Sequence, residues 1–192
     1  MRKVLAQSFF KSRNTPALAR KLVGKFLVRR YRGKTRAYQI TEVEAYDGFR
    51  DKASHAHRGM TKRNKIMFGK AGHWYVYFTY GMHWMLNIVT GPEKYPAAIL
   101  IRSIEADIRG SKRGTTQMHL AGPARLTKAL HIDKKLNGKV ATIKSGLWIE
   151  DRGLRGFKIK MAPRIGVAYA GPVWSKKKYR FLQIVHGRKS VK

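Results

Sequence analysis

The chain has 192 residues, of which 43% are hydrophobic and 11% aromatic, a composition that excludes a disordered basic tail and suits a folded protein with a sizeable core. Its 42 Lys and Arg residues outnumber 10 Asp and Glu residues, for a formal net charge of +32. Such a surplus of positive charge indicates a polyanionic partner, and nucleic acid is a better candidate than an anionic membrane. A general basic bias of the source proteome is the alternative explanation. Because the sequence contains no cysteine, disulfides, thiol catalysis and thiolate metal sites are excluded.

The N-terminal half is expected to hold one short helix and most of a sheet. Thr15-Pro16 predicts a helix N-cap followed by proline, and Gly24 predicts the residue just after that helix. Residues 44–72 are polar and irregular, which indicates a long functional loop that can hold a helical turn. Apolar and aromatic runs predict strands at 25–30, 35–43, 74–79, 82–90 and 97–103.

The C-terminal half carries weaker signals. Residues 104–120 are expected to form a connection with some helix, and Gly122-Pro123 predicts a second helix over 124–130. Further strands are predicted around 143–150, 163–170 and 180–185. No repeat, linker or change of composition divides the chain. We therefore expect one α+β domain over residues 1–192, with a curved, mostly antiparallel β-sheet surrounded by helices and a protruding β-hairpin.

The sequence gives no sign of export or of membrane insertion. The N-terminus lacks the apolar core of a signal peptide, and no apolar run approaches the length of a membrane span. We therefore expect a soluble cytoplasmic protein, associated with the nucleoid if the source is a prokaryote.

Acidic residues cluster in one short window of this basic chain. Four of the ten acids, Glu42, Glu44, Asp47 and Asp51, lie within residues 42–51. Acids at a docking surface would repel a polyanion, so they need another purpose. Glu42 and Glu44 share parity near the end of a predicted strand and can face one side, where a carboxylate suits a general base. Ordinary pairing with neighbouring basic residues explains such acids about equally well.

The segment Ser54-His55-Ala56-His57 has two interpretations. A His-x-His pair beside carboxylates can bind zinc, manganese or iron. It can equally supply a histidine that stacks or hydrogen-bonds, and we favour this role because no HExxH-type spacing accompanies the pair.

Aromatic residues concentrate between Trp74 and Trp84, which hold six of the 21 aromatics. Strand alternation places Tyr75 and Tyr77 on one face, where tyrosines can stack on planar bases. Tyr80 falls at the predicted turn, where an aromatic can wedge into a base stack. Ordinary β-propensity explains one face of this segment easily but explains the tyrosine at the turn poorly.

Basic residues flank the acidic window and can contact phosphates. The candidates for phosphate contact are Arg58, Lys62, Arg63, Lys65 and Lys70, with Arg58, Arg63 and Lys65 foremost. Together with an aromatic slot, an exposed aromatic turn and a carboxylate, they fit an enzyme that extrudes a base from the stack before acting on it.

An ordered series of motifs resembles the alkyladenine (3-methyladenine) DNA glycosylase family. The series keeps family order and near-family spacing from about Leu18 to Phe181 and is far more specific than any single motif. In chain order the motifs are Ile40-Thr41-Glu42-Val43-Glu44-Ala45-Tyr46, Ala53-Ser54-His55-Ala56, Arg63-Asn64-Lys65-Ile66-Met67-Phe68, Gly72-His73-Trp74-Tyr75-Val76-Tyr77, Tyr80-Gly81-Met82-His83-Trp84-Met85-Leu86-Asn87, Arg102, Ala121-Gly122-Pro123-Ala124-Arg125-Leu126 and Pro163-Arg164-Ile165-Gly166-Val167.

The resemblance implies catalytic and base-binding roles. Glu44 would be the general base that deprotonates the attacking water, and Arg102 would help to place that water and the carboxylate. Tyr46 and Tyr77 would sandwich the flipped base, with His55 stacking and hydrogen-bonding beside it.

The resemblance also implies how lesions are reached and selected. Tyr80 would fill the gap left by the flipped nucleotide, supported by Met82, and Asn87 would restrict normal guanine. The implied enzyme is a monofunctional glycosylase that acts as a monomer on double-stranded DNA, without metal or cofactor. It would release 3-methyladenine, 7-methylguanine or hypoxanthine and leave an abasic site.

Two other functions stay open at this point. One is a metal-dependent nuclease that uses Glu42, Glu44, Asp51 and His55 as ligands. The other is a basic nucleic-acid-binding module without enzymatic activity.

Overall fold

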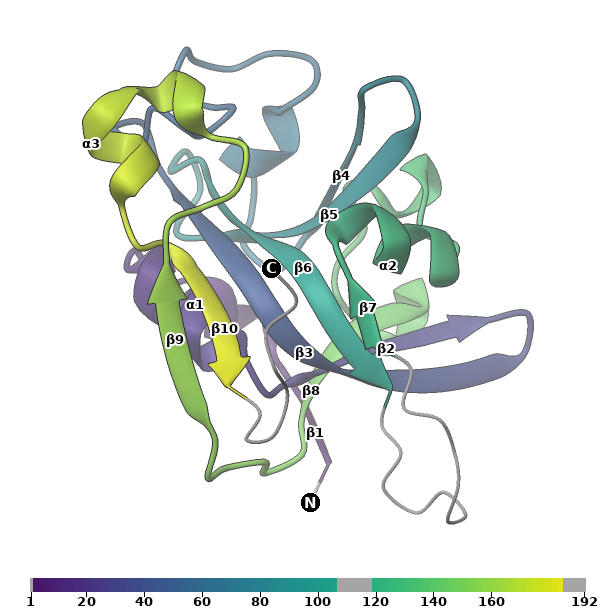
Figure 1. The fold of residues 1–192 in the computed structure, drawn as a ribbon. Coiled ribbons are helices and arrows are strands. Elements are labelled where there is room, and N and C mark those ends of the chain that lie inside the picture. The colour runs from purple at the N-terminus through teal and green to yellow at the C-terminus, as the bar shows by residue number, and fades with distance from the viewer. Residues whose placement is uncertain (1, 107–118, 185–192) are drawn as a thin grey trace.

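A computed structural model of the protein describes residues 2–106 and 119–184. In these residues ten strands form one sheet, and every paired set of strands is antiparallel (Figure 1). The strands are β1 (Lys3–Val4), β2 (Phe26–Tyr31), β3 (Lys34–Asp47), β4 (Trp74–Thr79), β5 (His83–Thr90), β6 (Ala97–Ala106), β7 (His119–Ala121), β8 (Leu147–Asp151), β9 (Lys158–Ala162) and β10 (Arg180–Ile184). The predicted antiparallel sheet is confirmed, and its combination with three described α-helices is consistent with the predicted α+β class.

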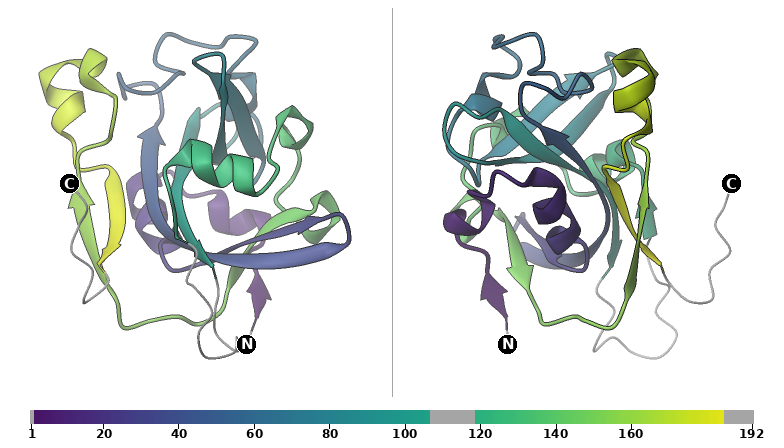
Figure 2. Two further views of the ribbon diagram at one scale, coloured as in Figure 1. Left: turned by 45° about the vertical axis from the view of Figure 1, so that its right-hand side comes forward. Right: turned by 90° about the vertical axis from the view of Figure 1, so that its left-hand side faces the viewer.

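Helices are short and lie around this sheet. Figure 1 shows α3 above the end of β9 and the start of β10, and Figure 2 shows α1 beside the sheet, where it packs on β3. The α-helices are α1 (Thr15–Leu22), α2 (Pro123–Ala129) and α3 (Gly171–Lys176), and the 3-10 helices are η1 (Gln7–Phe10), η2 (Lys65–Phe68), η3 (Lys134–Leu136), η4 (Ile143–Ser145) and η5 (Ala168–Ala170). Within the described ranges, no helix has the length and apolar character needed to cross a membrane.

Strand β3 is the centre of the sheet, because it pairs with β2, β6 and β10. Its 14 residues extend the predicted strand 35–43 to Asp47, so Glu44 lies inside the strand and not after it. There Glu44 is held between Leu100 of β6 and Arg180 of β10. The loop predicted over 44–72 therefore begins only after Asp47, and its helical turn is η2.

One face of the sheet packs on the main core and the other lines a cavity, because successive residues of a strand point to opposite sides. Val43 and Ala45 of β3 join the main hydrophobic cluster, which also takes residues from α1, β4, β5, β6 and β8. Their neighbours Glu44 and Tyr46 point to the other face, where the cavity described below is found. The same alternation in β4 sends Trp74 and Val76 into the core.

Several predicted boundaries agree with the structure, and others need correction. The strand at 74–79 is confirmed without change, and 82–90, 97–103 and 124–130 correspond to β5, β6 and α2. The cap of α1 is Asn14, whose side chain accepts from the Ala17 N–H at 3.0 Å, and not Thr15, whose hydroxyl is buried against that of Thr90.

The C-terminal predictions are less accurate. The run 143–150 divides into η4 and β8 at Gly146, whose φ of +75° turns the chain. The strand predicted over 163–170 is wrong, because this segment is irregular and ends in η5. The connection predicted over 104–120 contains the end of β6 and the start of β7, and residues 107–118 lie outside the described part, as does residue 185.

Candidate active site

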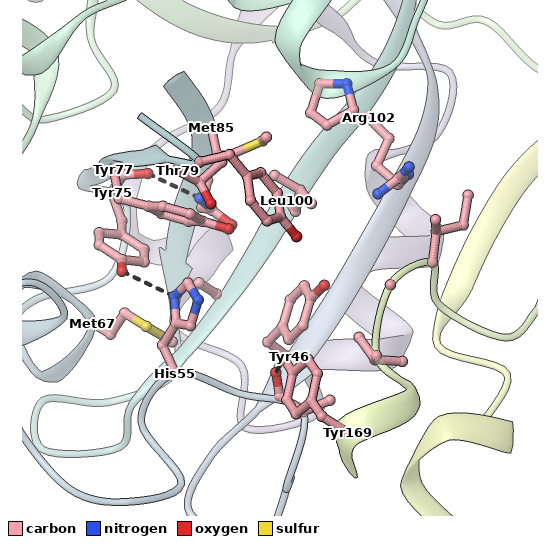
Figure 3. A pocket seen from close by; sticks show the side chains of 18 residues that line it. Tyr46, His55, Met67, Tyr75, Tyr77, Thr79, Met85, Leu100, Arg102 and Tyr169 are labelled. Atoms are coloured by element: carbon pink, nitrogen blue, oxygen red, sulfur yellow. Dashed lines mark hydrogen bonds between the residues drawn. The ribbon is translucent and has the colours of Figure 1, made fainter. Parts of the chain in front are cut away.

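A cavity of about 310 Å³ opens on the face of the sheet opposite the main core (Figure 3). It is bounded by β3, β4, β5, β6, the loop after β3 and the segment 163–170. Its volume is at the small end of the range for small-molecule sites, roughly 300–1,000 Å³, which suits one planar group. Five tyrosines line it: Tyr46, Tyr75, Tyr77, Tyr80 and Tyr169.

The carboxylate of Glu44 lies directly behind the wall of this cavity. The residue is fully buried. The Ile165 N–H donates to its Oε1 at 2.8 Å, and the Tyr46 hydroxyl donates to its Oε2 at 3.0 Å. Arg102 Nη1 donates to the same Oε2 at 3.3 Å. All three donor residues line the cavity, so the carboxylate is held by the cavity wall itself.

Burial is also the main influence on the titration of Glu44. Desolvation raises the pKa of this carboxyl, while the charge of Arg102 and the hydrogen bonds from Ile165 and Tyr46 oppose the rise. The result is a carboxylate that is more basic than an exposed glutamate and still has charged and hydrogen-bonding support.

Arg102 contacts both Glu42 and Glu44, which the sequence analysis predicted to face one side of a strand. Its Nε donates to Glu42 Oε1 at 3.2 Å while its Nη1 donates to Glu44. Glu42 also accepts from Ser103 Oγ at 2.7 Å and from Arg180 Nη1 at 3.0 Å. The shared side is therefore confirmed, and Glu42 serves to fix Arg102.

Aromatic rings form the opposite walls of the cavity. Figure 3 shows Tyr75 and Tyr77 across the cavity from Tyr46. The ring of His55 meets that of Tyr77 edge-on, with 4.7 Å between centroids, and its Nδ1 lies 3.2 Å from the Tyr75 hydroxyl. Although His55 is open to the cavity, desolvation by the surrounding protein, with the charge of Arg63, lowers its pKa to about 4. The imidazole is therefore neutral at neutral pH.

Asn87 and the tip of the β4–β5 hairpin complete the cavity. Asn87 is buried, and its Nδ2 donates to the Tyr75 carbonyl at 3.1 Å. At the tip, Tyr80 and Gly81 have φ values of +53° and +66°, the pattern of a type I′ turn. A tyrosine is poorly suited to this backbone, and its side chain is 83% exposed, with Met82 66% exposed. The tip thus holds exposed apolar groups on a strained turn.

The predicted basic residues divide into two kinds. Arg63 supports the hairpin, because its guanidinium lies 4.7 Å from the centroid of the Tyr77 ring and its Nη2 donates to the Phe78 carbonyl at 3.2 Å. Arg58 and Lys65 are exposed in the loop between β3 and β4.

A buried ion pair, which sequence reasoning missed, anchors the segment that carries Ile165. Arg164 makes a two-pronged contact with Asp51, and both side chains are fully buried. Arg164 Nη1 also donates to the Ala45 carbonyl at 2.8 Å, and its guanidinium lies 4.8 Å from the centroid of the Tyr46 ring. The pair thus fixes the chain just before Ile165 and supports Tyr46 from outside the cavity.

Tyr169 was also missed, and no local signal in the sequence marks it. Its hydroxyl donates to the Ala53 carbonyl at 2.8 Å, which places its ring at the cavity wall. Residues 163–167 belonged to the motif series, but without an assigned role.

The candidate metal ligands are engaged separately. Glu44 accepts from Ile165, Tyr46 and Arg102, as described above. Asp51 binds Arg164, and His55 contacts Tyr75. In residues 2–106 and 119–184 no group of three or more His, Asp or Glu side chains is arranged to hold a metal ion.

Comparison with known proteins gives consistent matches. A family model described as methylpurine-DNA glycosylase matches residues 8–186. A protein of Methanocella arvoryzae is 45% identical over 175 residues, which cover 88% of this chain and 86% of its own. A protein of Anaeromyxobacter dehalogenans is 42% identical over 92% of this chain and 82% of its own. One of Legionella pneumophila is 40% identical over 94% of both chains. All three are provisionally named 3-methyladenine DNA glycosylase.

Removal of the Arg164 guanidinium is expected to destabilise the protein strongly. Arg164→Met leaves Asp51 as an unpaired buried charge, which costs about 3–5 kcal/mol. The control is Arg155→Met, because Arg155 pairs with Asp151 while its side chain is 68% exposed, and an exposed pair contributes at most about 1 kcal/mol. Urea unfolding of both variants measures the difference. Equal losses would mean that the buried pair does not anchor the segment.

Proposed function

The chain belongs to the methylpurine-DNA glycosylase family, and from this premise we propose that it excises alkylated or deaminated purines from double-stranded DNA and leaves an abasic site. The family and the names of the relatives support a DNA-repair glycosylase that hydrolyses N-glycosyl bonds. The observation that carries the finer proposal is the buried carboxylate of Glu44, held behind a tyrosine-lined cavity by donors that belong to its wall.

Glu44 acts on the attacking water. A carboxylate has about four acceptor sites, and three are occupied by Ile165, Tyr46 and Arg102. The remaining site can accept a hydrogen bond from one water at the cavity wall. Glu44 takes a proton from this water, and the water oxygen bonds to the sugar C1′ while the bond from C1′ to the purine nitrogen breaks. The bonding electrons leave with the base, and the negative carboxylate stabilises the positive charge that develops on the sugar.

The cavity walls bind the extruded base. Tyr46 and Tyr77 present π-faces that attract a purine made cationic by alkylation at N3 or N7. Because His55 has a pKa of about 4, it adds no positive charge that would repel such a base. Asn87, buried in the cavity lining, limits which purine edge fits.

The hairpin tip and the surrounding basic residues engage the duplex. Tyr80 enters the gap left by the extruded nucleotide, and Met82 packs beside it. Arg58, Arg63 and Lys65 lie on the loop next to this hairpin, where their charges favour phosphates. Arg102 holds Glu44 and the water in place.

The proposed reaction is hydrolytic and monofunctional. It involves no metal or cofactor. A Schiff-base mechanism would need an amine in the cavity, and no lysine is among the described residues that line it. We propose that the enzyme acts as a monomer, with residues 1–192 as one catalytic domain.

Glu44→Gln is expected to abolish base release while lesion binding is retained. The amide keeps the shape of the side chain but cannot accept a proton, and loss of a general base costs about 10²–10⁴-fold in rate. The assay incubates duplexes that contain hypoxanthine or a methylated purine, treats them with alkali and measures cut strands on a gel. Glu93→Gln, which changes an exposed glutamate, is the control.

The same assay separates the alternatives. A strand cut without alkali, and lost on addition of EDTA, would indicate the nuclease. Unchanged base release by Glu44→Gln, or none by the wild type on any purine lesion, would refute the proposed role.

The pH dependence of base release should report the raised pKa of Glu44. The base must be deprotonated, so kcat/KM falls as pH is lowered through a midpoint above the ordinary value of 4.5. Tyr46→Phe keeps the aromatic ring but removes a donor that lowers this pKa, so it should move the midpoint to still higher pH. The test is the acid limb for a neutral lesion such as hypoxanthine. An unshifted midpoint in Tyr46→Phe would contradict the assignment.

Tyr80→Asn should stabilise the fold and impair the enzyme. Asparagine suits the positive φ of the turn, so unfolding is expected to become harder by about 1 kcal/mol. Without the aromatic wedge, base release from duplex DNA should fall more than tenfold, whereas release from single-stranded DNA should change little. Thermal unfolding and single-turnover assays on both substrates measure these effects. Equal losses on both substrates would show that Tyr80 does not act by insertion.

A further inference from the structure

A second cavity, of about 250 Å³, lies at the other end of α2 from the first. Pro123, the first residue of α2, lines the tyrosine cavity, whereas Ala129 and the following Leu130 line the second. The remaining walls come from the β2–β3 hairpin and from His131. Figures 1 and 2 show α2 between this hairpin and the β4–β5 hairpin.

The walls of this second cavity are strongly basic. Four of the described residues that line it carry a full positive charge, and none of those residues is acidic. In the part of the chain that the structure describes, none of the four forms a salt bridge. Asp133 influences Arg29 from a distance, but its side chain accepts a hydrogen bond from the Lys135 N–H. The four residues are Arg29, Arg32, Lys34 and Arg36.

The register of the β2–β3 hairpin brings like charges together. Arg29 lies directly opposite Arg36, and Tyr31 lies opposite Lys34. Like charges opposite each other on one face of a sheet are destabilising. Arg29 is fixed in this position, because its guanidinium donates to the carbonyls of Leu130 at 3.0 Å, His131 at 3.1 Å and Gly146 at 3.2 Å. Packing thus holds positive charges on neighbouring strands, and among the described residues no acid forms a salt bridge with them.

Backbone strain occurs at the same place. Four described non-glycine residues have positive φ, and Arg32 at +46° and His131 at +49° both line this cavity. A third, Tyr80, lines the tyrosine cavity. Arg32 and Gly33 form a two-residue turn of the same kind as Tyr80 and Gly81, with positive φ at both positions. Such strain tends to persist where a side chain has a functional position.

The aromatic group in this cavity is not free to bind a base. The rings of Tyr31 and His131 stack with 4.5 Å between centroids, and the guanidiniums of Arg29 and Arg32 lie 5.2 Å and 5.4 Å from the Tyr31 centroid. Because Arg29 already donates to three carbonyls, the groups left for a ligand are mainly the cationic donors of Arg32, Lys34 and Arg36. Guanidinium and ammonium groups without acidic partners match phosphate oxygens.

We propose that this second cavity binds phosphates of the DNA duplex beside the damaged nucleotide, as an anchoring site separate from the lesion cavity. The inference rests on the proposed function in one respect, that DNA is the partner. The seven residues of α2 span about 10 Å at 1.5 Å per residue, about three base pairs at 3.4 Å each. One duplex can therefore reach both cavities, and the phosphates bound at the second lie about three or more pairs from the lesion.

The test removes two of the charges at positions that tolerate the change. Arg32→Asn suits the turn, and Arg36→Gln relieves the repulsion with Arg29, so the double variant should unfold at a higher temperature than the wild type. Its affinity for a lesion duplex should depend less on salt, with the slope of log Kd against log salt smaller by about two. The control, Lys158→Gln with Lys160→Gln, removes the same charge from exposed positions of β9, far from this hairpin (Figure 1).

A scan with neutral methylphosphonate linkages locates the contact. Neutral linkages about three to five pairs from the lesion should weaken binding of the wild type but not of the double variant. An unchanged salt slope, a scan without such a position or an equal effect of the control would overturn the proposal. If the double variant bound anionic phospholipid vesicles more weakly than the wild type but bound DNA equally well, the proposal would be overturned, and the second cavity would be assigned to a membrane surface instead.

Base release by the wild type under single-turnover conditions separates this inference from the proposed function. The double variant should match the wild-type rate at saturating enzyme, because the lesion cavity is unaltered. If neither protein releases any base, the proposed function fails. If both release base and the salt slopes agree, only the second site fails.

Discussion

Burial of the Glu44 carboxylate is costly unless donors surround it, and this requirement determines where many other residues lie. A carboxylate removed from water needs hydrogen bonds or a partner charge. The donors come from three separate parts of the chain: Tyr46 of β3, Arg102 of β6 and the Ile165 N–H. Glu42 in turn fixes Arg102, and the pair of Asp51 and Arg164 fixes the chain before Ile165. One desolvated charge thus accounts for a network that spans the sheet.

Local patterns in the sequence were sufficient for β4, one face of which meets the core. The alternation over 74–79 predicted both β4 and the tyrosine face of the cavity, because packing on one side enforces the two-residue period. The segment 163–170 gave a false strand, since short apolar runs between glycines imitate that period. Its conformation depends on the contact of Arg164 with Asp51, 113 residues away, and local spacing carries no trace of such a contact. Roles such as that of Glu44 came from the family motifs and not from periodicity.

The two hairpins show a common conflict between stability and position. Each has a two-residue turn with positive φ at both positions, and each places a large side chain, Tyr80 or Arg32, where a small residue would fit the backbone better. The strain is tolerated because the strands on either side hold the turn. A turn of this kind fixes the direction of its side chain better than a longer flexible loop would.

The late position of Ile165 in the sequence has a consequence for biosynthesis. A ribosome that makes this chain adds β3 and β6 well before residue 165, so the Ile165 amide and the Arg164 partner of Asp51 are among the last groups to reach the fold. The buried carboxylate of Glu44 therefore gains its full set of donors only when translation is nearly complete. A chain that stops before residue 164 would leave two buried carboxylates, Glu44 and Asp51, short of their partners, and we expect it to fold poorly.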